Sequence, residues 1–189
     1  MIALKRLLLA ISATAVAVPV SAQIGAYDGE KFVKAVREGN ATEALKLLGE
    51  TPTLVNVRDL SGRTALIEAI ENRDTQWVGY LLQKEADPNL ALRDGETPLI
   101  AAAKVGLVDV TRWLIERGAR VDDTNRMGET ALIVAVQRRQ VPVARFLVDA
   151  GADPDKTDSA AGYSARDYAK RDTRTPELLR IIESKKPAS

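Results

Sequence analysis

A Gly, a Thr and a Pro precede an apolar run in the stretch DGETPLIAAAKVG, from Asp94 to Gly106. A glycine turn that opens a helix can bind phosphate through the backbone N–H groups at the helix N-terminus. A phosphate-binding loop occurs once per site, but this stretch recurs. SGRTALIEAIENR from Ser61 and MGETALIVAVQRR from Met127 stand 33 residues before and after it. The recurrence favours a structural repeat over a phosphate site.

Two residue types that many catalytic centres use are absent from the chain. It contains no His and no Cys, which excludes Ser-His-Asp triads, Cys-His dyads, disulfides and metals held by His or Cys. No Ser is followed three residues later by Lys, the spacing of one group of nucleophilic serines. Paired carboxylates could still hydrolyse a glycosidic bond, although no pair stands out. We expect no enzyme and no cofactor, with a carboxylate-based hydrolase on a repeat scaffold as the alternative.

One acidic tract, DPDKTD from Asp153 to Asp158, is a candidate calcium loop. An EF-hand loop needs Gly at its sixth position and a bidentate Glu at its twelfth. Asp158 and Ser164 stand at these positions. The tract is predicted to be a turn between repeats, and no metal site is expected.

Three aromatic residues, Tyr80, Trp113 and Phe146, are also separated by 33 residues. They could form a ligand-binding box, but equivalent positions of a repeat array lie over one another, which favours a stacked core column. If Trp113 belongs to that core, its replacement by Ala should cost roughly 3–5 kcal/mol.

Each repeat is predicted to contain two helices. Thr97 can cap a helix that includes Pro98 in its first turn and ends before Gly106. A second helix is predicted from about Val108 to Arg117, where Gly118 follows. The tract GARVDDTNRMG then leads through an extended turn into the next unit.

Residues of four types recur in register over three units. They are Gly62, Gly95 and Gly128; Thr64, Thr97 and Thr130; Leu66, Leu99 and Leu132; and Ala69, Ala102 and Ala135. This pattern resembles the ankyrin repeat, G-x-T-P-L-H-x-A-A followed by a second helix and G-A-D-x-N. The matching residues of one unit are Gly95, Thr97, Pro98, Leu99, Ala101, Ala102, Leu114, Ile115, Gly118, Ala119 and Asp122. The resemblance implies an all-α ankyrin-repeat solenoid of stacked helix-turn-helix units with short hairpin fingers.

The sequence departs from the family pattern in two places. Ile67, Ile100 and Ile133 replace the family's histidine, so its hydrogen bond to the capping Thr is missing and an apolar side chain must fill the space. Arg73 and Arg139 stand where Gly106 ends its helix, which predicts slight strain in those turns.

The repeats divide the chain into segments. Three full repeats are predicted over residues 59–158. Residues 27–58 and 159–185 are predicted to be N- and C-terminal capping repeats, because the ends of a solenoid need a polar outer face. Residues 186–189 form a tail.

The N-terminal segment has the layout of a secretory signal peptide, predicted for residues 1–22. Lys5 and Arg6 precede an apolar run from Leu7 to Val18, and Val-Ser-Ala precedes a cleavage site after Ala22. A membrane anchor is the alternative, but a span needs about 20 apolar residues. Cleavage would leave 25 basic and 26 acidic residues, a formal charge of −1. That balance gives no electrostatic reason to expect nucleic acid or an anionic membrane as the partner.

The family resemblance implies that partners contact the finger tips and the exposed side of each first helix. The residues at these positions are Arg58, Leu60, Arg63, Glu71, Arg93, Asp94, Glu96, Lys104, Arg126, Met127, Glu129, Gln137, Arg138 and Tyr163. We expect a monomeric, non-catalytic protein-binding module that is periplasmic or secreted, with a periplasmic or secreted protein as its partner. A solvated face without a partner is the alternative. The chain resembles small bacterial periplasmic ankyrin-repeat proteins, which implies a role in stress defence or in neutralising effectors.

Overall fold

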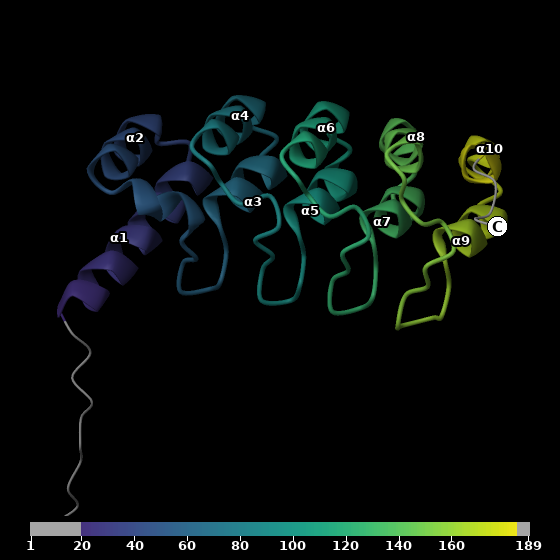
Figure 1. The fold of residues 1–189 in the computed structure, drawn as a ribbon, viewed down its shortest axis with the longest axis horizontal. Coiled ribbons are helices and arrows are strands. Elements are labelled where there is room, and N and C mark those ends of the chain that lie inside the picture. Colours follow the sequence, from purple (N-terminus) through teal and green to yellow (C-terminus); the bar gives the residue numbers. More distant parts are fainter. Residues whose placement is uncertain (1–19, 185–189) are drawn as a thin grey trace, which may run out of the picture.

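The structure, a computed structural model, describes residues 20–184. Its helices form two rows, with the odd-numbered helices in one and the even-numbered helices in the other (Figure 1). The first row contains α1 (Val20–Arg37), α3 (Ala65–Glu71), α5 (Pro98–Val105), α7 (Ala131–Gln137) and α9 (Ala165–Arg171). The second contains α2 (Ala41–Glu50), α4 (Thr75–Gln83), α6 (Val108–Glu116), α8 (Val141–Asp149) and α10 (Pro176–Ser184), and a short 3-10 helix, η1 (Pro52–Asn56), follows α2.

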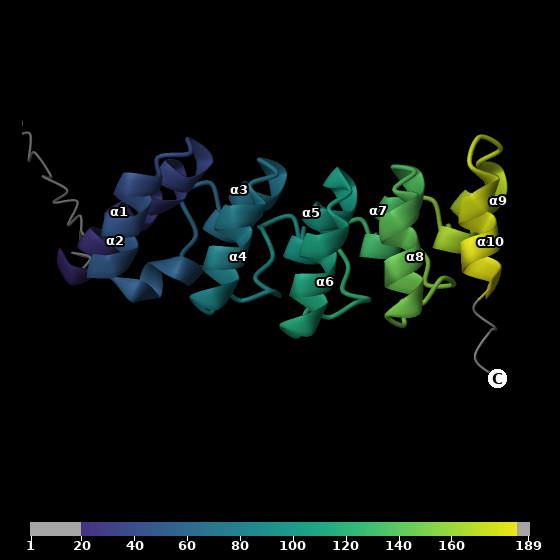
Figure 2. The same ribbon diagram turned by 90° about the horizontal axis from the view of Figure 1, so that it is seen from above.

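Each pair stacks on the next along one axis (Figure 2). Within a row, α3 contacts α5 and α5 contacts α7, while α4 contacts α6 and α6 contacts α8. The described residues thus form an all-α solenoid, as the sequence predicts. These contacts join neighbouring units, which is typical of repeat proteins.

The predicted start and end signals of the first helices are present. The hydroxyls of Thr64, Thr97 and Thr130 each accept a hydrogen bond from the N–H three residues on, at 3.3, 3.2 and 3.2 Å. Gly106 ends α5 in the left-handed conformation with φ 80°. Arg73 and Arg139 adopt the same conformation with φ 60° and 55°, so the predicted strain in these turns is confirmed.

A third non-glycine residue shares this strain, and it was not expected. Glu85 has φ 64° at the end of α4, where Gly118 and Gly151 stand in the next two repeats. The 33-residue alignment would have revealed it.

The core runs continuously through the stack. Ile67, Ile100 and Ile133 are buried, at 0%, 2% and 0% exposure. The expectation that an apolar side chain fills the space of the family's histidine is therefore confirmed.

The predicted aromatic core column is wrong. Tyr80, Trp113 and Phe146 are only partly buried, whereas Leu81, Leu114 and Leu147, one residue further along each helix, are fully buried. The sequence spacing identified equivalent positions, but these positions lie at the edge of the core. One residue corresponds to about 100° of rotation around a helix, which separates the two columns.

Four hairpin fingers project from the same side of the stack (Figure 1). Single antiparallel bridges join Arg58 to Thr64 and Thr124 to Thr130. The fourth finger is closed between Thr157 and Ser164 and is one residue longer. Neighbouring fingers also bind each other, because the Arg126 N–H donates to the Asp94 carbonyl at 2.8 Å and the Ser159 N–H to the Met127 carbonyl at 2.8 Å.

The predictions for residues 1–19 and for the tail lie outside the described residues. α1 begins at Val20, so the predicted cleavage after Ala22 falls in its first turn. Within residues 20–184, no helix is both long enough and apolar enough to cross a membrane.

Candidate protein-binding surface

Three polar side chains at equivalent positions organise the finger loops. Asp59 accepts hydrogen bonds from the Ser61 hydroxyl and the Arg63 N–H at 2.6 and 2.8 Å. At the equivalent position, Asn125 accepts from the N–H groups of Met127 and Glu129 at 2.9 and 3.0 Å. These anchors were missed by the sequence reasoning, although an Asp or Asn three residues before a Gly signals a turn.

The fourth finger uses Asp158 in the same way, which confirms that the acidic tract is a turn. Its carboxylate accepts from the N–H groups of Ala161 and Gly162 at 2.7 and 3.0 Å and from the Tyr168 hydroxyl at 2.5 Å. Burial alone would raise the pKa of Asp158, but these hydrogen bonds outweigh it and hold the pKa below its usual value.

The N-terminal half of the surface beside the fingers is filled by ion pairs. Arg37 contacts Asp59 at 2.7 Å and Glu68 at 3.1 Å, and both carboxylates are buried. Arg63 joins Glu68 to Glu71. The hydrogen bond to Glu68 is the largest influence on Arg37 and raises its pKa further above the usual range.

The ion-pair network ends on α5. The Lys104 ammonium lies 3.4 Å from Glu71 and 3.2 Å from Glu96. Burial alone would lower the pKa of Lys104, but these carboxylates raise it overall. The charged side chains of this network, which runs from Arg37 to Lys104, therefore neutralise one another within the protein.

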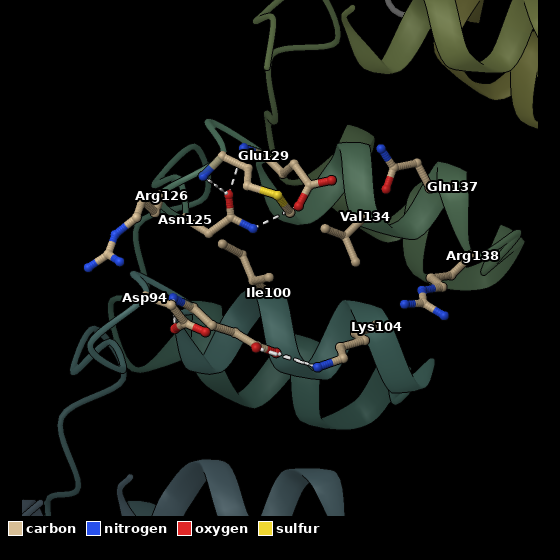
Figure 3. Close-up of a pocket in the computed structure, with 11 residues that line it drawn as sticks. Asp94, Ile100, Lys104, Asn125, Arg126, Glu129, Val134, Gln137 and Arg138 are labelled. Atoms are coloured by element: carbon tan, nitrogen blue, oxygen red, sulfur yellow. Dashed lines mark hydrogen bonds and ion pairs between the residues drawn. The ribbon is translucent and has the colours of Figure 1, made fainter. Parts of the chain in front are cut away.

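Beyond Lys104 the surface opens into a hollow between α5 and α7 (Figure 3). Its volume is about 400 Å³, within the range of roughly 300–1,000 Å³ that is typical of ligand sites. The lining residues are Asp94, Glu96, Ile100, Lys104, Asn125, Arg126, Met127, Glu129, Val134, Gln137 and Arg138. Ile100 and Val134 lie at its centre, between the finger residues and Arg138.

The hollow brings together eight of the predicted partner-contact residues. They are Asp94, Glu96, Lys104, Arg126, Met127, Glu129, Gln137 and Arg138. The predicted residues outside it are Arg58, Leu60, Arg63, Glu71, Arg93 and Tyr163. The sequence reasoning missed Ile100, Asn125 and Val134, because the first two were assigned to the core and to a turn and Val134 was not considered.

Some of the predicted contact residues bind other side chains of the protein. Arg63 and Glu71 are partly buried in ion pairs, and Tyr163 lies under the Arg171 guanidinium at 3.8 Å. Leu60 and Met127 are free on the surface, at 75% and 53% exposure. The predicted contact set is thus a mixture of exposed groups and structural ones.

The side chains of the finger-tip arginines Arg93 and Arg126 both contact the preceding finger. The Arg126 guanidinium donates to the Arg93 carbonyl at 2.9 Å. The Arg93 side chain lies across Gly62 of the preceding finger, where a Cβ would come within 2.5 Å of it. Gly62 has φ 89°, so this position requires Gly for both its conformation and the close approach.

The outer surface, formed by the second helices, carries hollows that are more open to solvent. In the one between α6 and α8, Arg112 stacks on Phe146 at 4.8 Å and Arg145 pairs with Glu177 at 2.6 Å. Among residues 20–184, no group of three or more acidic side chains is arranged to hold a metal ion.

Stacked helix pairs with finger hairpins and an open hollow beside them define a solenoid with an extended recognition surface. Ankyrin-repeat models match the chain twice, as one repeat over residues 61–91 and as three copies over residues 84–158. The chain belongs to the ankyrin-repeat family, whose members are in general non-catalytic scaffolds that bind proteins. A comparison with curated proteins found no match.

Proposed function

We propose that this protein is an exported, non-catalytic module that binds a periplasmic or secreted protein through its fingers and first helices. The observation that carries the proposal is the hollow between α5 and α7, which has an apolar centre and a polar rim. Protein interfaces combine these two features, with apolar anchors inside and hydrogen-bonding groups around them.

The charges on this surface favour a protein over a nucleic acid. Asp94 and Glu129 lie among the basic residues of the hollow, where they would repel a phosphate backbone. Arg guanidinium groups beside an exposed Met suit a partner that offers both carboxylates and apolar side chains. Stress defence or effector neutralisation is the role that we propose for such binding, on the resemblance to periplasmic members of the family.

The test is capture of a partner from the periplasmic fraction of the source cells. The double variant Arg93→Glu, Arg126→Glu should weaken capture at least about tenfold, equivalent to about 1.4 kcal/mol. Because the Arg126 side chain also joins two fingers, the thermal melt of the variant must be compared with that of the wild type. Arg112 and Arg145 are poor controls, since both have partners on the outer surface.

A better control is the double variant Lys46→Glu, Arg174→Glu. Both side chains are exposed, and neither forms an ion pair within residues 20–184. This variant changes the net charge by the same amount and should capture the partner as the wild type does. Loss of capture by this control alone would contradict the proposed surface.

Export is proposed from the signal-like segment at residues 1–22. Removal of this segment should produce a protein that begins at Gln23. Mass mapping of the N-terminus after cell fractionation checks this. A chain that keeps residues 1–22 in the membrane fraction would contradict it.

A further inference from the structure

The N-terminal half of the recognition surface differs from the C-terminal half in how its charged side chains are paired. This difference indicates which chemical groups a partner must offer. On the first helices, ion pairs from Arg37 to Lys104 neutralise the side chains that take part in them. In the next unit, Gln137 replaces Lys104 and Val134 replaces Ala101, so the ion-pair network cannot continue. The hollow begins at this point.

The centre of the hollow is apolar. Ile100 and Val134 form its floor at 2% and 6% exposure, and Met127 stands beside them on the finger at 53% exposure. An unbranched thioether can adjust its shape to an apolar group placed against it. The floor and Met127 together suit an aliphatic side chain.

Of the basic side chains on the rim, one has no acceptor among the described residues. Lys104 is held by Glu71 and Glu96, and Arg126 donates to a backbone carbonyl. The Arg138 side chain is exposed, and its guanidinium makes no hydrogen bond or ion pair with any other described residue. A guanidinium has five donors and binds a carboxylate best through two of them.

Two acidic residues of the rim already accept hydrogen bonds from groups of the finger loops. Asp94 accepts from the Glu96 N–H at 3.1 Å, and Glu129 accepts from the Asn125 amide at 2.8 Å. Because these two carboxylates already have hydrogen-bond donors and the Arg138 guanidinium has no acceptor, the rim favours an anionic partner group over a cationic one.

Building on the proposed function, we propose that the hollow between α5 and α7 binds an acidic segment of the partner that carries an aliphatic residue. The aliphatic side chain lies against Ile100, Val134 and Met127, and a neighbouring carboxylate pairs with Arg138. The charged groups of the ion-pair network in the N-terminal half of the surface are paired within the protein, so this half contributes little to the free energy of binding the partner.

The repeats themselves supply variants that should fold. Asn72 stands where Arg138 does, two repeats earlier. Tyr168 stands where Val134 does in the next unit, once the extra residue of the fourth finger is allowed for. Arg138→Asn therefore removes the charge, and Val134→Tyr fills the hollow, with side chains that this backbone already accommodates.

The experiment uses three short fluorescein-labelled peptides and measures their fluorescence anisotropy with the full mature chain. The first has a central leucine flanked by aspartates. The second has serine in place of the leucine, and the third has lysines in place of the aspartates. The first peptide should bind at least about tenfold more tightly than the other two.

Each variant should remove one part of this preference. Arg138→Asn should abolish the preference for aspartate over lysine and keep that for leucine over serine, while Val134→Tyr should abolish the preference for leucine. The matched control Arg174→Asn, which removes an exposed charge elsewhere, should bind all three peptides as the wild type does. Thermal melts of the variants within a few degrees of the wild type would show that they fold.

Three results of the peptide experiment would overturn the inference. They are equal binding of the leucine and serine peptides, unchanged peptide preferences in both hollow variants, and no binding of the first peptide at millimolar concentration. Arg138 would then serve only as a favourable charge at the C-terminus of α7. A captured partner that is weakened by the finger variant but not by the hollow variants would also refute it, and would leave the proposed function standing.

Discussion

Trp113 and Leu114 are neighbours on α6 but lie in different surroundings. Leu114 is fully buried between repeats. Trp113 is half-buried at the outer edge of the core, where its ring lies beside Gly79 of α4. A large side chain that keeps part of its surface in water contributes less to folding than its size suggests.

We therefore expect Trp113→Ala to cost about 1–2 kcal/mol, less than the value that follows from a core position. Leu114→Ala, which leaves a cavity, should cost about 2–5 kcal/mol. Urea unfolding of the two variants against the wild type measures both changes. A larger loss of stability for Trp113→Ala than for Leu114→Ala would support the prediction of an aromatic core column.

At the scale of the elements, the finger hairpins depend on buried carboxylates. Burial alone would raise the pKa of Asp59, but hydrogen bonds from Ser61, Arg63 and Arg37 lower it overall. Hydrogen bonds lower the pKa of Asp158 in the same way. A carboxyl whose pKa is lower in the folded state contributes stability that is fully present above its unfolded pKa of about 3.9 and is lost as the pH falls through the folded value.

Asp158→Asn tests this dependence, because Asn125 already organises the preceding finger. The variant should lose about 1 kcal/mol at pH 7, since the amide keeps part of the hydrogen bonding but not the charge. The difference from wild type should shrink below about pH 4, where the carboxyl becomes protonated first in the unfolded chain and, at lower pH, in the folded protein. Urea unfolding at both pH values measures this.

The exposed Asp149 on α8 provides the control for this prediction. Asp149→Asn should change the stability by less than about 0.5 kcal/mol. An Asp158→Asn variant whose loss of stability is the same at both pH values would show that the charge of this carboxylate does not support the finger.

For the whole molecule, stability is shared between neighbouring repeats. α6 contacts α4 on one side and α8 on the other, and a solenoid is stabilised by such interfaces. Leu114→Ala should therefore lower hydrogen-exchange protection in α4 and α8 as well as in α6. Loss of protection confined to α6 would mean that each helix pair is stable alone.

Much of this fold is determined by local sequence signals that recur. A Thr hydroxyl caps a helix by reaching an N–H only three residues away, and a Gly ends it through its own φ angle, so Thr97 and Gly106 could be interpreted without knowledge of the rest of the chain. Recurrence at 33 residues then predicts stacking, because units that cannot bury their apolar faces alone must bury them on one another. The same logic placed Ile100 in the core.

The tertiary structure decided which equivalent positions are buried, paired or free. Spacing aligned Trp113 with Tyr80 and Phe146 but could not show that they lie beside the core. The sequence also could not show that Lys104 reaches Glu71 of the preceding repeat, or that Arg138 pairs with no carboxylate among residues 20–184. A cap depends on bonds between near neighbours, whereas burial and ion pairing depend on how far side chains of different repeats reach across the stack. That distance is set by the packing of the helices and not by the residues of any one repeat.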